Sequence, residues 1–130
     1  MRYISLLIAA TVSFLSCTKN KQSGRCNTYF NITSTTTTQT TTIAAGITTI
    51  VGGYGYNGCF QFAGSEVKNL TGNNIEIRLK GTIPCEATIC TDMLVGARDT
   101  LKISTPAAGT YYLKFFSGSS FVKTDTVLVN

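Results

Sequence analysis

The side chains that could do chemistry in this chain of 130 residues are five cysteines and six carboxylates, and the chain has no histidine. Proton transfer near neutral pH usually depends on histidine, so Ser-His-Asp and Cys-His nucleophile systems are excluded. The carboxylates are spread along the sequence: Glu66, Glu76, Glu86, Asp92, Asp99 and Asp125. A carboxylate pair for glycoside hydrolysis would have to be brought together by the fold. We therefore predict no catalytic residues, no cofactor and no enzymatic activity.

The cysteines point to disulfides, with no metal site. Cys85 and Cys90 are separated by four residues, which does not fit the two-residue spacing of redox and zinc motifs. Without histidine, a zinc site would need four thiolates, and an exported chain favours disulfides. If Cys17 is set aside, Cys26, Cys59, Cys85 and Cys90 form an even set with three possible pairings. A bond between Cys85 and Cys90 would staple a short loop.

The N-terminus has the layout of an export signal. A short basic start, Met1 to Tyr3, precedes an apolar stretch from Ile4 to Leu15, which is shorter than the roughly 20 residues that span a bilayer. The junction Phe14-Leu15-Ser16-Cys17 resembles a bacterial lipobox, in the form common in Bacteroidetes lipoproteins. The resemblance implies a signal peptide over 1–16 and a diacylglycerol group on Cys17. The alternative is an ordinary secretory peptide, with Cys17 as a fifth disulfide candidate.

A lipidated tether, 17–26, would link this anchor to the domain. It is basic, with Lys19, Lys21 and Arg25, and it lacks the acidic residues that often follow the cysteine of surface-exported lipoproteins. The resemblance therefore implies an outer-membrane lipoprotein that faces the periplasm. Cations elsewhere are scattered and are not interleaved with aromatic residues, so we expect no nucleic acid partner. The expected partners are the membrane, through the lipid, and a glycan or protein of the cell envelope, bound by a monomer.

Hydrophobic patterning predicts a single all-β domain over 27–130. The clearest strand is Asn74 to Lys80, where Ile75, Ile77 and Leu79 alternate with charged residues. Further strands are expected around Leu101 to Ile103, Tyr111 to Phe115 and Phe121 to Val129. Turn-forming clusters separate these runs at the spacing of an antiparallel β-sandwich, and at most one short helical turn fits near Thr91 to Val95.

The threonine-rich stretch from Thr33 to Thr42 is predicted to form strands or an exposed sheet edge. Threonine is β-branched and favours strands, and Tyr29, Phe30, Ile32 and Ile43 can anchor the stretch at both ends. A mucin-like stalk is the alternative, but it would normally contain proline, and this stretch has none.

The C-terminal third has a recognisable pattern. The segment Pro106 to Phe115 resembles the step into a late strand of immunoglobulin-like domains, where a tyrosine hydroxyl bonds back to the backbone. Together with Asn57-Gly58-Cys59, Gly72 to Ile77 and Ile89-Cys90-Thr91, it is similar to small β-sandwich lipoproteins of Bacteroidetes without an assigned activity. This resemblance implies an immunoglobulin-like antiparallel β-sandwich. It also implies a Cys59–Cys90 disulfide, which leaves Cys26 with Cys85.

Two further features bear on function. The loop Gly52 to Gly58 combines glycines with Tyr54, Tyr56 and Asn57, a composition suited to ligand recognition, although it could also be a plain hairpin connection. The triplets Asp99-Thr100-Leu101 and Asp125-Thr126-Val127 resemble the O-glycosylation site of exported Bacteroidetes proteins, with Thr100 and Thr126 as acceptors.

The function expected from these features is a lipid-anchored binding or structural module of the cell envelope. Two alternatives belong to other classes. A pilus or surface-assembly subunit would donate a terminal strand, for which Phe121 to Val129 is the candidate. An inhibitor of an exported enzyme would present a rigid loop near Cys85 and Cys90.

Overall fold

A computed structural model describes residues 24–86 and 88–130, and these residues form strands and no helix. The strands are β1 (Arg25–Tyr29), β2 (Asn31–Thr37), β3 (Thr40–Thr41), β4 (Ile47–Gly55), β5 (Gln61–Asn69), β6 (Asn74–Pro84), β7 (Val95–Ile103), β8 (Gly109–Ser117) and β9 (Ser120–Val129). The predicted signal peptide and Cys17 lie outside the described residues. None of the described residues belongs to a helix long and apolar enough to cross a membrane.

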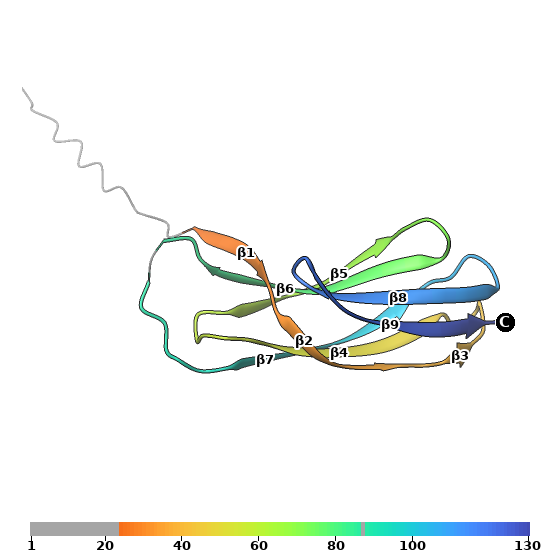
Figure 1. The fold of residues 1–130 in the computed structure, drawn as a ribbon, viewed down its shortest axis with the longest axis horizontal. Coiled ribbons are helices and arrows are strands. Elements are labelled where there is room, and N and C mark those ends of the chain that lie inside the picture. Colours follow the sequence, from red (N-terminus) through yellow and green to blue (C-terminus); the bar gives the residue numbers. More distant parts are fainter. Residues whose placement is uncertain (1–23, 87) are drawn as a thin grey trace, which may run out of the picture.

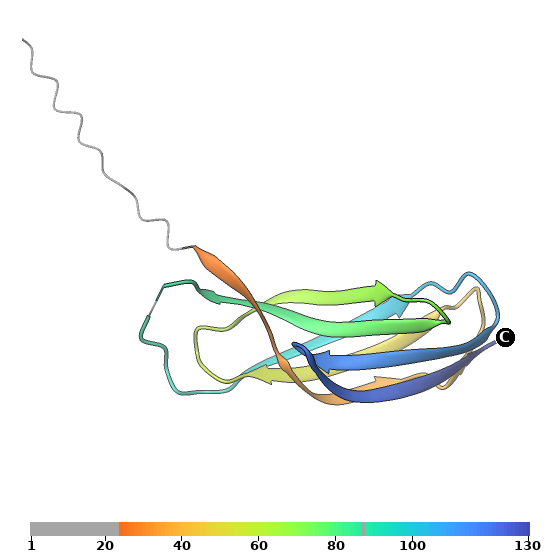
Figure 2. The same cartoon turned by 45° about the horizontal axis from the view of Figure 1, so that its top comes forward.

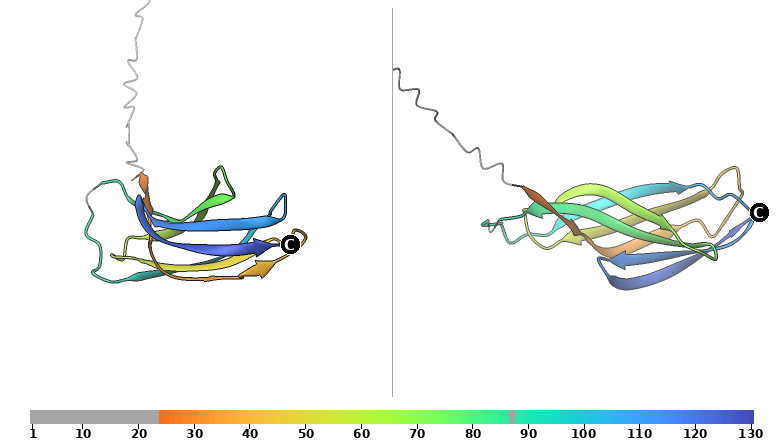
Figure 3. Two further views of the ribbon diagram at one scale, coloured as in Figure 1. Left: turned by 45° about the vertical axis from the view of Figure 1, so that its right-hand side comes forward. Right: turned by 90° about the horizontal axis from the view of Figure 1, so that it is seen from above.

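The strands form two sheets that stack face to face as a β-sandwich (Figures 1 and 3). The larger sheet has the order β1-β6-β8-β9-β3, and β5 pairs with β6 as well. The smaller sheet has the order β2-β4-β7. The predicted fold class, an all-β sandwich, is therefore confirmed.

Most strand pairings are antiparallel, but two are parallel, which the sequence did not predict. β6 runs parallel to β8 from Asn74↔Tyr112 to Ile77↔Phe115, and β3 runs parallel to β9. Parallel neighbours need a long crossover connection, and here β7 in the opposite sheet lies between β6 and β8 in the sequence.

The core lies between the sheets and follows the predicted alternation. In β6, Ile75, Ile77 and Leu79 are buried, while β8 contributes Leu113 and Phe115. Each such side chain contributes about 1.5 to 3 kcal/mol when it is fully buried. The remaining buried hydrophobic residues lie in β2, β4, β7, β8 and β9 and in two connections between strands: Phe30, Ile32, Ile47, Val51, Phe60, Ile103, Tyr111, Val127 and Val129.

The predicted strands and turns agree with the structure. The strand expected over Asn74 to Lys80 is part of β6, and the threonine-rich stretch forms β2 and β3. The helical turn considered near Thr91 to Val95 is absent, and a bend at Asp92 takes its place. The folded part begins earlier than expected, because Arg25 and Cys26, assigned to the tether, belong to β1.

The first three strands pass from one sheet to the other and back (Figure 2). The crossing from β1 to β2 takes place at Phe30, which is fully buried, and whose backbone N–H donates to the carbonyl of Leu79 at 2.9 Å. The Phe30 ring packs edge to face on Phe60, with the ring centroids 5.3 Å apart. The crossing is therefore held by the core itself.

The tyrosine bond that the immunoglobulin resemblance implies is present. The hydroxyl of Tyr111, at the start of β8, donates to the carbonyl of Ala107 at 2.9 Å, and the Tyr111 side chain is buried. It fixes the turn between β7 and β8.

Candidate functional site

The residues singled out in the sequence fall in three places. The cysteines and the predicted ligand loop lie at the end of the sandwich where the described chain begins, which we call the disulfide end (Figure 1). Thr100 lies in β7 of the smaller sheet, and Thr126 lies in β9 of the larger sheet. The opposite end, with the turns at 42–46, 70–73 and 104–108, is called the distal end.

Two disulfides are present, as predicted. One joins Cys26 to Cys85, with 4.9 Å between the Cα atoms, and the other joins Cys59 to Cys90, with 5.4 Å. This is the pairing that the lipoprotein resemblance implies. The alternative disulfide between Cys85 and Cys90 is not formed. Among the described residues, no group of three or more Cys, Asp or Glu side chains could hold a metal ion.

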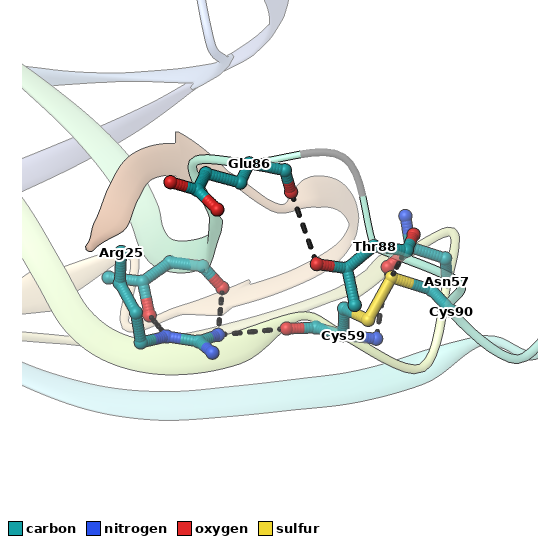
Figure 4. Close-up of a disulfide and its surroundings, with 7 residues drawn as sticks. Arg25, Asn57, Cys59, Glu86, Thr88 and Cys90 are labelled. Atoms are coloured by element: carbon teal, nitrogen blue, oxygen red, sulfur yellow. Dashed lines mark hydrogen bonds between the residues drawn. A yellow bond between two sulfur atoms is a disulfide. The ribbon is translucent and has the colours of Figure 1, made fainter. Parts of the chain in front are cut away.

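Arg25 ties the disulfide end together with hydrogen bonds (Figure 4). Its guanidinium donates to the carbonyls of Cys59 and Thr82, each at 2.8 Å, and to the hydroxyl of Thr82. The side chain of Asn57 accepts a hydrogen bond from the N–H of Cys59 at 3.0 Å. The polar atoms of this end therefore hold its loops in place.

The predicted ligand loop is better described as packed structure. Gly52 to Gly55 belong to β4, and 56–60 form the connection to β5 in the other sheet, so the alternative of a hairpin connection is wrong. A Cβ atom on Gly53 would collide with the carbonyl oxygen of Asn31, and one on Gly55 would collide with the Phe60 ring. These glycines therefore allow close packing of the backbone and do not form a mobile loop.

The three side chains proposed as ligand contacts do not converge. Tyr54 lies half-buried in β4, and the side chain of Asn57 accepts the hydrogen bond from the N–H of Cys59. Tyr56 packs edge to face on Phe60, with the ring centroids 5.1 Å apart. Tyr56 nevertheless keeps 59% of its surface exposed. No shared cavity joins the three.

A polar groove with a volume of about 440 Å³ lies between β2 and β9. We call it the threonine groove. It is lined by Thr35, Thr36, Thr37, Gln39, Lys123, Thr124, Asp125 and Thr126. A second depression of about 250 Å³ extends it along the same strands and shares Thr35 and Lys123. Of the site residues predicted from the sequence, only Thr126 lines this groove; the signal that could have located it is the threonine run together with Asp125.

The floor of the threonine groove is a hydrogen-bond network around Asp125. One carboxylate oxygen accepts from the hydroxyls of Thr35 at 3.0 Å and Thr37 at 2.7 Å, and the other pairs with Lys123 at 2.7 Å. Partial burial alone would raise the pKa of Asp125, but the bonds from Lys123, Thr37 and Thr35 outweigh it and hold the pKa below the usual value. The carboxylate is therefore ionised at neutral pH and joins the two sheets.

One border of the groove is an open strand edge. The N–H of Leu128 donates to the carbonyl of Gln39 beside β3, and backbone groups in a strand alternate in direction, so the N–H groups of Thr126 and Thr124 point the same way. β3 pairs with β9 only at Leu128 and Val129. Among the described residues, no strand pairs with that edge of β9 from Ser120 to Val127.

The two proposed glycosylation triplets have matching structural settings. Thr100 and Thr126 are exposed, whereas the aspartate before each points inward and reaches the opposite sheet. Asp99 accepts from the hydroxyl of Ser65 at 2.6 Å, in parallel with Asp125 and its threonines. Both aspartates therefore have a role in joining the sheets.

The fold and its cross-links define the class of this protein as a small, disulfide-bonded β-sandwich domain. A family model, the ORF11 beta-sandwich domain, matches residues 49–127, which is more than half of the chain. The chain belongs to this family. The match begins within β4 and includes Cys59 and Cys90, but not β1, β2 or β3. Comparison with curated proteins and with solved structures gave no match.

Proposed function

We propose that this protein is an exported, lipid-anchored β-sandwich module of the cell envelope that binds an extended peptide segment in the threonine groove. The observation that carries the binding site is the groove beside the unpaired edge of β9. An extended peptide can add to such an edge through main-chain hydrogen bonds, while side pockets select its side chains. The hydroxyls of Thr35 to Thr37 and the ion pair of Lys123 with Asp125 would contact the polar side chains of the bound peptide.

The anchor is proposed from the lipobox-like junction at Cys17. The four other cysteines are paired with one another, which leaves Cys17 without a disulfide partner among them and supports a different use for its thiol. With a basic tether, we keep the periplasmic face of the outer membrane as the proposed location. Two acyl chains anchor firmly where one chain would be marginal.

The anchor is tested in a Bacteroidetes host by comparing wild type with Cys17→Ala. Wild type should fractionate with membranes and carry the mass of the acyl groups, and Cys17→Ala should have neither property. An unmodified, soluble wild type would overturn the anchor.

The peptide site is tested with two substitutions at one residue. Thr126→Val removes the hydroxyl and keeps the N–H that faces the groove, whereas Thr126→Pro removes both. Proline is tolerated at an edge position whose N–H has no ladder partner. Linear peptides are first selected from a displayed random library on immobilised Cys17→Ala protein. Thr126→Val should retain most of their affinity, and Thr126→Pro should lose roughly tenfold, the value of about one hydrogen bond.

The same pair of variants distinguishes a peptide from a glycan. A ligand held by the threonine hydroxyls, such as a glycan, would be lost equally from both variants. Binding that neither variant changes would place the ligand site elsewhere. Thermal unfolding of both variants controls for a general loss of structure.

The inhibitor hypothesis is the second candidate, because one observation favours it. Ile89 is fully exposed, with a relative exposure of 101%, on a loop that both disulfides hold in place. The assembly-subunit hypothesis has less support, since the strand it would donate, β9, is paired with β8 along its whole length. Val127 and Val129 of β9 are also buried in the core, so releasing the strand would expose them.

A further inference from the structure

Large apolar side chains are exposed together at the disulfide end. Tyr56 is 59% exposed, Ile89 is 101% exposed, Met93 is 54% exposed and Leu94 is 65% exposed. We call these four residues the apolar rim. They come from two segments far apart in the sequence, the connection between β4 and β5 and the loop before β7.

The two segments of the apolar rim are held side by side. The Cys59–Cys90 disulfide joins them, and the N–H of Gly58 donates to the carbonyl of Thr91 at 2.8 Å. A Cβ atom on Gly58 would collide with the side chain of Thr91 and lie 3.3 Å from Cγ of Met93, so this glycine lets the two segments approach closely. These links hold both loops beyond the ends of the strands (Figure 1).

The described chain enters the domain at the same end of the sandwich as the apolar rim (Figure 1). The carbonyl of Gly24 accepts a hydrogen bond from the N–H of Cys85 at 2.9 Å, and Cys85 is bonded to Cys26. Seven residue steps separate Cys17 from Gly24, which limits their separation to about 25 Å even in a fully extended chain. A lipid on Cys17 would therefore keep this end of the sandwich close to the bilayer surface.

We propose that the apolar rim rests in the interfacial layer of the membrane to which the protein is anchored. The inference depends on the proposed anchor and identifies the part of the domain surface that contacts the lipid. Aliphatic side chains and a tyrosine with a polar tip suit the boundary between headgroups and acyl chains. A tether this short raises the local concentration of membrane at the rim, so that a small apolar contact suffices.

This contact orients the domain. Glu86 and Asp92 lie in the same loop as the rim residues Ile89, Met93 and Leu94, and they offset the charge of Arg25 at this end, so the contact made by the rim itself is apolar. With the disulfide end on the membrane, the long axis of the sandwich stands away from the surface (Figure 3). The distal end and the threonine groove then face the aqueous compartment.

The absence of tryptophan in the sequence allows a direct test. Ile89→Trp places a single tryptophan on the rim, and Ile43→Trp places one on an exposed residue of the distal end as a matched control. The chain from Cys17 onward, which keeps every described residue, is coupled through the thiol of Cys17 to a maleimide lipid. The vesicles contain phosphatidylethanolamine and phosphatidylglycerol, with or without brominated acyl chains.

The expected result for Ile89→Trp is a shift of tryptophan emission to shorter wavelength on coupling, with several-fold stronger quenching by brominated lipid than Ile43→Trp shows. Adding Leu94→Asp to the Ile89→Trp variant should reduce that quenching. Equal, weak quenching of the two single-tryptophan variants would overturn the inference. Because the lipid is supplied chemically, that result would leave the proposed cellular acylation standing, and a failure of cellular acylation would in turn leave this measurement intact.

A rim used for a protein partner gives a different pattern. If the loop serves as an enzyme inhibitor, the rim tryptophan of the coupled Ile89→Trp variant stays in water and keeps its long-wavelength emission. That outcome overturns the membrane contact and favours the inhibitor hypothesis.

Discussion

The two ends of the sandwich hold their loops by different means. At the disulfide end, the loops are cross-linked by Cys26–Cys85 and Cys59–Cys90 and expose apolar side chains. At the distal end, the turns are held by hydrogen bonds, both within a turn and between neighbouring turns, and by backbone geometry. Tyr111 donates to Ala107 there, and Asn73 donates to the carbonyl of Thr110 at 3.2 Å.

The difference shows which interactions stabilise a short turn and which stabilise a longer loop. Short turns satisfy their own backbone groups, so a tyrosine hydroxyl, an asparagine amide and a glycine in the left-handed region are enough to fix them. The loop from Cys85 to Leu94 is longer, its described residues bury little apolar surface, and covalent links replace the packing that they lack. An end built in this way can expose apolar residues without losing its shape.

The largest effect is expected from removing a disulfide. Cys26→Ser with Cys85→Ser, or Cys59→Ser with Cys90→Ser, should lower the free energy of unfolding by roughly 2 to 5 kcal/mol. The first pair spans 59 residues and the second spans 31, so the first removal should cost about 0.6 kcal/mol more on loop-closure entropy. Urea denaturation of the two double variants measures both values. A larger loss for the second pair would mean that packing around Cys59 and Cys90 outweighs chain entropy.

A smaller effect is expected from the turn between β5 and β6. Gly72 has φ of +69°, a left-handed conformation, and Gly72→Ala should cost about 1 to 2 kcal/mol. The control is Gly96→Ala in β7, where a Cβ atom meets nothing within 4 Å and φ is not left-handed. Thermal unfolding should show a lower midpoint for Gly72→Ala and little change for Gly96→Ala. Equal losses would indicate that the cost is not backbone strain.

The tyrosine bond should contribute about 1 kcal/mol. Tyr111→Phe removes the hydroxyl that donates to Ala107 and leaves the buried ring in place, so the loss should lie in the range of one hydrogen bond, roughly 0.5 to 1.5 kcal/mol. Tyr112→Phe, on an exposed neighbour in β8, is the control and should be close to neutral. If Tyr111→Phe were also neutral by chemical denaturation, water would have replaced the bond.

The smallest effect on stability is expected at the apolar rim. Ile89 is fully exposed, so Ile89→Ser should change the free energy of unfolding by less than about 0.5 kcal/mol. The comparison is Ile77→Val, which removes one methyl group from a fully buried side chain and should cost about 1 kcal/mol. A large loss in Ile89→Ser would show that the rim is part of the folded core and has no surface role.

Local patterns in the sequence predicted the strands well. The alternation of Ile75, Ile77 and Leu79 reflects the two faces of a strand, a property of neighbouring residues alone. The threonine run also predicted strands from a local property, because a β-branched side chain favours an extended backbone wherever it lies. The loop composition around Tyr54, Tyr56 and Asn57 does not show how closely this segment packs, because the close approach of Gly53 to Asn31 cannot be seen in a local window.

By itself, the sequence determined the all-β class, the turns and the even set of cysteines left after Cys17, because period, turn chemistry and count are local or compositional properties. Only the tertiary structure decided that β6 lies parallel to β8, that β2 faces β9 across the threonine groove, and that Gly24 lies at the same end of the sandwich as the apolar rim. Each of these depends on contacts between residues far apart in the chain. Such contacts are selected by the packing of the whole core, and no short stretch of sequence encodes them.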